Sequence, residues 1–473
     1  MKGHPSRHMV IVVFISMGAL FLLSAVPWGR ITGNRIKDFN LIEDLVPRPK
    51  PAVVAEAQPE APAIDPELEN FMAENAKPVE ELPAEPVPEA VVEVDTSVVE
   101  HVPVVVEEVA TVDSAGMVLI ESYGEAMLPR FRAALSRGKA RVAVLGDSFI
   151  EGDIFTQDLR AMLQERYGGE GVGYVGMHSD FPGFRQTVRL GGRGWKMRDI
   201  RNFSGRDTVR TVSGEYGLAS AGAKATYKGS KSRKALGSWS RSRFLFVSPD
   251  SGTVTLTTDA GPRSFAVAPS GEVQMLELEG ATGEFVVESD IPGMVGLGVY
   301  LDAAGGGVQV DCMSIRGNSG IGHRKMNMRL AAGMRRWVDY DLIVLEYGMN
   351  ALSPEQYNYE PYAVAMAKVV ERIRSCYPDA DIIVLGVSDR GVKNGADVRS
   401  LHTCEAMVKA QRSAARRTGV HFWDTRMAMG GDNAVVDWRR RKLVNADYIH
   451  LNYAGGKELA TLFYQSLNAS LGE

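Results

Sequence analysis

Short apolar runs alternate with helical patterns over much of the chain. Nearly uninterrupted apolar residues occupy 141–145, 342–345 and 382–386, which is typical of strands buried on both faces of a sheet. Apolar residues at helical spacing occupy 117–138, 155–167, 355–376, 398–418 and 455–469. Strands that alternate with helices predict an α/β fold with a parallel sheet, and such sheets bind ligands beyond the carboxyl ends of their strands.

A different pattern interrupts this order from about residue 178 to 310. Short alternating runs, as in SRFLFVSPDSGTVTLTTDAG, are separated by Gly, Ser, Asp and Pro, and such runs predict an antiparallel β-sandwich. We expect this sandwich, 178–310, to be inserted into an α/β domain made of 113–177 and 311–473. Large aromatics of the insertion are candidates for stacking on sugar rings, with burial in a core as the alternative. These are Trp195, Tyr216, Tyr227 and Trp239, of which Trp195 and Trp239 are taken as candidate substrate contacts.

The first 112 residues show a membrane-anchor pattern followed by an acidic spacer. After a short basic segment, 1–8, residues 9–28 form about 20 uncharged, mostly apolar positions, enough to span a bilayer as a helix. This length favours an uncleaved transmembrane anchor over a cleaved signal peptide, whose apolar core is shorter. Residues 29–112 are rich in Pro, Glu and Val, with about 15 acidic side chains against one lysine within 51–112. Proline and like charge both extend a chain, so we expect a disordered linker here.

Composition argues against several kinds of chemistry. The three cysteines, Cys312, Cys376 and Cys404, are too few for a disulfide framework and match no CxxC metal site. The eight histidines form no HExxH motif, and the chain has no GxxxxGK[ST] loop and no strand-GxGxxG-helix unit. We therefore expect no metal, no cofactor and no nucleic-acid partner. Outside the acidic linker the chain is mildly basic, which suits an anionic polymer or a membrane surface, and equally an ordinary solvated surface.

Polar residues that could act together follow the predicted strands at their carboxyl ends. They are Ser148 in a Gly-Asp-Ser turn, Gly317 in RGNSG, Asn350 in EYGMNAL, and Asp447 and His450 in DYIH before the last helix. Each has a structural alternative, since Ser and Asp also cap helices and Gly and Asn also form turns. Their common placement at strand ends, in this order, favours a single site.

The chemistry of an acyl-transfer site explains why these residue types belong together. A serine hydroxyl needs a base within hydrogen-bond reach, which His450 can supply, and the base needs an orienting partner, which Asp447 can supply. A tetrahedral oxyanion needs donors, for which the backbone N–H groups of Ser148 and Gly317 and the side-chain amide of Asn350 are candidates. We predict Ser148, Asp447 and His450 as catalytic residues. Asp147 is a further candidate substrate contact.

These blocks resemble the SGNH (GDSL-type) hydrolase family, named for its Ser, Gly, Asn and His. The resemblance covers 141–177 and 311–471 and implies a flavodoxin-like three-layer α/β/α sandwich. One departure is Ala351, where many members have Asp. Within the family, GDSFIEGDIFTQDLRAMLQERYGGEGVGYV, RGNSGIG and EYGMNAL look like the peptidoglycan O-acetylesterase group, which carries a carbohydrate-binding-module-like insertion. That resemblance implies a serine esterase that removes O-acetyl groups from MurNAc. The members of that group act outside the cytoplasm, so together with the predicted anchor 9–28 the resemblance implies a single-pass protein of the bacterial inner membrane whose catalytic domain faces the periplasm.

Two other functions remain open from the sequence. The same acetyl-serine could pass its acetyl group to a sugar hydroxyl, which would make the protein an O-acetyltransferase beside a membrane acetyl-transfer protein. The choice of acceptor depends on how water is excluded and how the sugar is held, which the motif residues do not reveal. A non-catalytic glycan-binding scaffold is the alternative from another class, although all the motif residues are intact.

Overall fold

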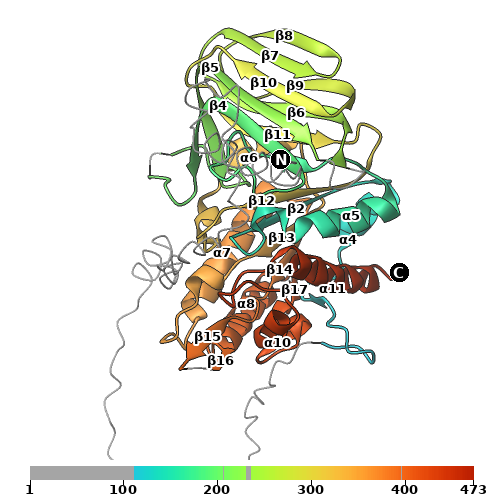
Figure 1. Cartoon of the computed structure of the whole chain (residues 1–473), viewed down its shortest axis with the longest axis vertical. Coiled ribbons are helices and arrows are strands. Elements are labelled where there is room, and N and C mark those ends of the chain that lie inside the picture. The colour runs from blue at the N-terminus through green and yellow to red at the C-terminus, as the bar shows by residue number, and fades with distance from the viewer. Residues whose placement is uncertain (1–110, 206, 231–235, 396, 473) are drawn as a thin grey trace, which may run out of the picture. The chain divides into compact units, whose positions relative to one another are not determined.

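The computed structural model describes residues 111–472, apart from 206, 231–235 and 396 (Figure 1). The predicted basic segment 1–8, the predicted membrane helix 9–28 and nearly all of the predicted linker 29–112 lie outside the described residues. Among the helices that the structure describes, none combines the length and the apolar character needed to cross a bilayer. The described part contains a six-stranded sheet, a nine-stranded sheet and a two-stranded hairpin.

The six-stranded sheet has the strand order of a flavodoxin-like fold. Across it lie β1 (Glu121–Ser122), β17 (His421–Trp423), β14 (Asp381–Leu385), β13 (Leu342–Glu346), β2 (Lys139–Gly146) and β12 (Gly307–Ser314). All neighbours pair in parallel except β1, which is antiparallel to β17. In chain order the five parallel strands stand 2-1-3-4-5, so the order reverses between β2 and β13. The predicted α/β fold is confirmed.

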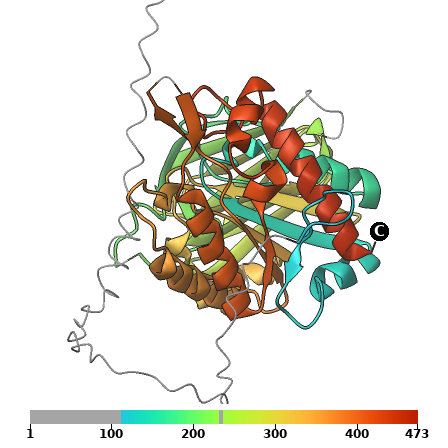
Figure 2. The same cartoon turned by 90° about the horizontal axis from the view of Figure 1, so that it is seen from below.

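Helices cover both faces of this sheet and complete three layers (Figure 2). One layer contains α6 (Met328–Arg335), α7 (Glu360–Cys376) and α8 (Cys404–Thr418); the other contains α4 (Pro129–Ser136), α5 (Thr156–Tyr167) and α11 (Tyr453–Leu471). Side chains of β2 alternate between the layers, since Ala143 and Leu145 pack toward α7 and α8 while Val142 and Val144 pack toward α5 and α11. Burial on both faces accounts for the uninterrupted apolar runs in the sequence.

Several predicted helices are shorter than the apolar pattern indicated. Only Pro129–Ser136 of the segment 117–138 is helical. Proline lacks an N–H and favours the first helical turn, and Leu128 before it has a left-handed φ of 45°, so the helix cannot extend further back. The segment 398–418 likewise becomes helical only at Cys404. Its first residues belong to the hairpin of β15 (Gly391–Asn394) and β16 (Asp397–Ser400).

The nine-stranded antiparallel sheet, which we call the β-domain (173–302), lies between α5 and β12 in the chain. Its strands are β3 (Gly173–Val175), β4 (Val188–Asp199), β5 (Glu215–Gly229), β6 (Trp239–Ser248), β7 (Gly252–Thr258), β8 (Gly261–Val267), β9 (Ser270–Thr282), β10 (Glu284–Ser289) and β11 (Val295–Asp302). The branches β10-β7-β8 and β11-β6-β9 pair with different halves of β5. Side chains of both branches, such as Phe246 and Val254, share one core. The insertion is therefore a sheet folded back on itself, and it begins and ends a few residues before the predicted 178 and 310.

The β-domain and the α/β domain share a buried boundary. Leu245 and Leu297 lie in the same apolar core as Met313 and Met334 of the α/β domain. At the end of β11 the buried Asp302 carboxylate accepts hydrogen bonds from three arginines. These are Arg141 of β2 at 3.0 Å and Arg241 and Arg243 of β6 at 2.8 and 2.5 Å. Because a buried carboxylate is costly to leave unpaired, this cluster fixes β11 against β2.

Candidate active site

Ser148 stands immediately beyond β2, at the point where the strand order of the sheet reverses. Gly146, the last residue of β2, has no room for a side chain, because a Cβ there would lie 2.7 Å from both Glu346 Oε2 and Ile150 Cδ1. The Asp147 carboxylate accepts the N–H of Phe149 at 2.8 Å, which closes a tight turn. The turn leaves Ser148 half-buried at the strand tip.

The structure brings the three predicted catalytic residues together. Ser148 Oγ lies 2.9 Å from His450 Nε2, and His450 Nδ1 lies 2.8 Å from Asp447 Oδ2. The serine hydroxyl can therefore donate to the imidazole, whose other nitrogen donates to the carboxylate. This is the hydrogen-bond order that a Ser–His–Asp triad requires.

The loop that carries Asp447 and His450 is held by its own backbone. Asp447 Oδ1 accepts the N–H groups of Ile449 at 2.9 Å and His450 at 3.1 Å. Tyr448, which directly follows Asp447, has a left-handed φ of 58°. Burial alone would raise the pKa of Asp447, but the hydrogen bonds from the His450 ring and from these N–H groups outweigh burial and lower it. The carboxylate thus stays ionised and fixes the orientation of the imidazole.

Two of the three predicted oxyanion donors, Gly317 and Asn350, follow β12 and β13, the two strands that flank β2. Gly317 has a left-handed φ of 76°, and the one atom near a Cβ built there is Arg201 Cδ at 4.0 Å, so its backbone is open to a ligand. Asn350 lies in a short 3-10 turn, Met349–Ala351. Its Nδ2 donates to Asp147 Oδ2 at 2.7 Å and to the carbonyl of Asn318 at 3.2 Å. Asn350 can therefore donate to an oxyanion when one of these two acceptors gives way to it.

Sequence reasoning missed the part played by Asn318. Its side chain is buried, and its Oδ1 accepts the N–H of Gly320 at 2.9 Å, which shapes the loop after Gly317. Its carbonyl is the second acceptor for the Asn350 amide. Its position directly after Gly317 in RGNSG was the available signal, since Asn commonly bonds to the backbone two residues on.

Asp147 is not a substrate contact, which corrects the prediction. The side chain is fully buried, and its two oxygens accept from Phe149 N–H and Asn350 Nδ2. Burial raises the pKa of Asp147 to about 7, against the lowering effects of those two hydrogen bonds and of nearby His450. Glu346, at the end of β13, is also buried, and burial together with Asp147 raises its pKa well above the usual range. Asp147 therefore positions Asn350, and Glu346 lies behind the serine turn.

The aromatic residues predicted to meet a sugar are core residues. Trp195 is 6% exposed and packs edge-to-face on Phe244, and Trp239 is 1% exposed and donates its Nε1–H to Ser242 Oγ at 2.6 Å. Tyr216 and Tyr227 are buried as well. The structure therefore corrects the prediction that Trp195 and Trp239 contact substrate. An alternating pattern does not reveal which face of a strand is enclosed, and here the aromatic face is the inner one.

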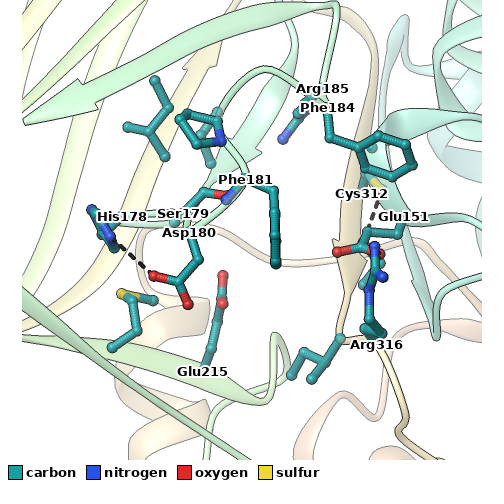
Figure 3. Close-up of a pocket in the computed structure, with 18 of the residues that line it drawn as sticks. Glu151, His178, Ser179, Asp180, Phe181, Phe184, Arg185, Glu215, Cys312 and Arg316 are labelled. Carbon is teal, nitrogen blue, oxygen red and sulfur yellow. Dashed lines mark hydrogen bonds and ion pairs between the residues drawn. The ribbon is translucent and has the colours of Figure 1, made fainter. Parts of the chain in front are cut away.

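A pocket opens between the α/β domain and the β-domain (Figure 3), and it is lined by residues close to Ser148 and Gly317 in the chain. One wall holds Glu151, three residues beyond Ser148, and Arg316, directly before Gly317; their side chains pair at 2.8 Å. The other wall belongs to β3, β4 and β5 and includes Glu215. Phe181, on the loop between β3 and β4, is 61% exposed and lies against Arg316, with 5.5 Å from the guanidinium to the ring centre. An aromatic residue in the turn-rich segment HSDFPGF was the available signal for this pocket.

Taken together, these features define the class of the protein. A flavodoxin-like sheet that carries a Ser–His–Asp triad at its switch point, flanked by Gly and Asn on the two neighbouring strand ends, is the arrangement of an SGNH-type serine hydrolase. Within the described part of the chain, no three His, Cys, Asp or Glu side chains are grouped to hold a metal ion.

Comparison with known proteins finds one family model that resembles part of the chain. Residues 292–457 match the model of the GDSL-like Lipase/Acylhydrolase family. The match includes Gly317, Asn350, Asp447 and His450, and Ser148 lies before it. No curated protein matches the chain.

One solved structure shares the fold, and others are less similar. One described as "Peptidoglycan O-acetylesterase in action, 5 min" is 23% identical, covers 75% of this chain and 99% of its own, and superposes with a TM-score of 0.63. A family two carbohydrate esterase from Clostridium thermocellum in complex with cellohexaose is 13% identical over 59% of this chain and 99% of its own, with a TM-score of 0.25. The first of these likenesses extends the common fold over both the α/β domain and the β-domain.

Proposed function

We propose that this protein is a carbohydrate O-acetylesterase that removes acetyl groups from a cell-envelope glycan, with O-acetylated muramic acid units of peptidoglycan as the substrate. The hydrogen-bond chain from Ser148 through His450 to Asp447 carries the esterase part of this proposal. The fold shared with a peptidoglycan O-acetylesterase over nearly all of that chain supports the choice of polymer. The predicted anchor and linker add an expected place, the periplasmic side of the bacterial inner membrane.

The geometry supports the following role for each group in the proposed reaction. Ser148 Oγ attacks the acetyl carbonyl carbon while His450 Nε2 takes the hydroxyl proton. The carbonyl oxygen becomes an oxyanion that the Ser148 and Gly317 N–H groups and the Asn350 amide stabilise. Collapse breaks the bond to the sugar oxygen, which leaves with the proton from His450, and acetyl-Ser148 remains. Water then attacks the acetyl carbon with His450 again as the base, which releases acetate and restores the serine.

The test compares the full-length chain with Ser148→Ala on two substrates, 4-nitrophenyl acetate and O-acetylated peptidoglycan, with free acetate as the readout. We expect acetate from both substrates with the native chain and from neither with the variant. Turnover of the small ester without acetate from the polymer would refute peptidoglycan as substrate. Acetyl transfer to an added glycan in place of acetate release would replace hydrolysis with transfer. No turnover of either substrate would refute the enzyme.

A further inference from the structure

The pocket between the α/β domain and the β-domain contains more polar groups than ester hydrolysis uses. The triad and the oxyanion donors account for the reaction, yet none of them lines this pocket. It lies next to them in the chain on both sides, through Glu151 after Ser148 and Arg316 before Gly317. A ligand held there would therefore lie beside the acyl group that Ser148 attacks.

The arginines in the pocket do not favour a ligand that carries an acidic group. Three arginines line the pocket, and each faces a carboxylate. The pairs are Arg316 with Glu151 at 2.8 Å, Arg201 with Asp199 at 2.8 Å, and Arg185 with Asp153 at 3.4 Å. An arginine that is already neutralised gains little from a second carboxylate, whereas paired carboxylates and guanidinium groups still accept and donate hydrogen bonds to hydroxyl and amide groups.

Glu215 supplies an acceptor within the pocket. Its Oε1 accepts the Tyr174 hydroxyl at 3.0 Å, and a Cβ at Gly176 would lie 2.6 Å from the same oxygen, so the carboxyl is held closely on that side. Figure 3 shows the carboxyl pointing into the space that Asp180, Phe181 and Arg316 surround. Burial raises the pKa of Glu215 to about 7, so at neutral pH this carboxyl can both accept and donate a hydrogen bond.

Phe181 supplies an apolar face. Its ring is among the most exposed large apolar side chains that the structure describes, and it lies on a loop whose base is anchored. Arg185 at that base donates to the carbonyls of Tyr174 at 2.9 Å and Val172 at 3.2 Å. A flat aromatic face beside planar hydrogen-bonding groups matches a pyranose ring, which has apolar C–H faces and a polar edge.

We propose that this pocket is a subsite for a neutral N-acetylated sugar ring, the neighbour of the ring whose ester is cleaved, with Phe181 stacking on the ring and Glu215 bonding to its edge. The place of this ring in the polymer rests on the function proposed above. Recognition of a neutral ring beside the scissile unit would select for a glycan chain over an isolated acetyl ester.

The test separates binding from turnover by using Ser148→Ala, which cannot consume an ester. Tri-N-acetylchitotriose, a neutral probe, is titrated calorimetrically into full-length Ser148→Ala. The titration is repeated with Ser148→Ala combined with Phe181→Ala, Glu215→Ala or Tyr357→Ala. Tyr357 is the matched control because it is 69% exposed and lies outside the pocket lining. We expect binding that weakens roughly threefold to tenfold with Phe181→Ala. Glu215→Ala should weaken it roughly tenfold, and Tyr357→Ala should leave it unchanged.

Three outcomes would overturn the subsite: no binding of the probe to Ser148→Ala, equal binding with and without Phe181, or tighter binding of tri-galacturonic acid than of the neutral probe. Binding that depends on Phe181 in a protein that releases no acetate from any ester would sustain the subsite and refute the esterase. Acetate release together with probe binding that is unchanged by substitution of Phe181 and Glu215 would sustain the esterase and refute the subsite.

Discussion

The Asp147→Asn substitution tests whether the buried Asp147 carboxyl, in the turn before Ser148, holds a proton in the folded protein. The native carboxyl has a pKa of about 7 against an ordinary value of 3.8. Between these pH values the folded chain binds a proton that the unfolded chain has released, so the free energy of unfolding falls as pH rises. At about 1.4 kcal/mol for each tenfold change, and with the group only partly titrated at each end of the range, the loss from pH 4 to pH 7 amounts to roughly 3 kcal/mol. Asparagine has the same shape and no such proton, so the variant lacks this loss.

The assay is urea unfolding followed by tryptophan fluorescence at several pH values from 4 to 8. We expect the stability of Asp147→Asn relative to the native chain to improve by roughly 3 kcal/mol from pH 4 to pH 7. Because Asp147 contributes to the raised pKa of Glu346, both chains carry Glu346→Gln, so that the Asp147 carboxyl is the one difference between them. Asp250→Asn, in an exposed turn, is the control. Equal pH dependence of Asp147→Asn and the native chain would refute the reasoning.

Three further substitutions test the site and the core. Asn350→Ala should lower kcat on 4-nitrophenyl acetate roughly 10²–10³-fold with little change in KM, and a change in KM alone would remove Asn350 from the oxyanion site. Asp447→Asn should lower kcat about 10⁴-fold while circular dichroism stays native; a drop of less than tenfold would contradict its orienting role. Trp239→Ala should lower the free energy of unfolding by roughly 3–5 kcal/mol, and an unchanged urea midpoint combined with weaker glycan binding would restore Trp239 as a substrate contact.

The triad could be predicted from the sequence because parallel sheets obey a simple rule. Apolar runs identified β2, β13 and β14, and the carboxyl ends of parallel strands lie at one edge, which gathers Ser148 and Asn350 although 202 residues separate them. His450 and Asp447 were recognisable as a pair because three residues separate them before a helix. The hydrogen-bond distances that join Ser148, His450 and Asp447 come from the structure alone.

Other features depend on partners that the sequence does not indicate. Asp147 looks like any turn residue until Asn350 and Glu346 are seen around it. The alternation in β4 and β6 predicts two faces without telling which is enclosed, so Trp195 and Trp239 could be assigned to the wrong side. Phe181 lies in a segment with no periodic pattern, and its exposure follows from the loop that Arg185 anchors.

The three arginines around Asp302 affect which spacing of groups along a polymer the site could recognise. They join β11 and β6 of the β-domain to β2, the strand that presents Ser148. This buried cluster holds the strand that leads to the nucleophile at a fixed distance from the sheet that forms the far wall of the pocket. Such a fixed distance suits a polymer in which each ester lies at a constant distance from a recognisable neighbouring unit, whatever the length of the polymer on either side.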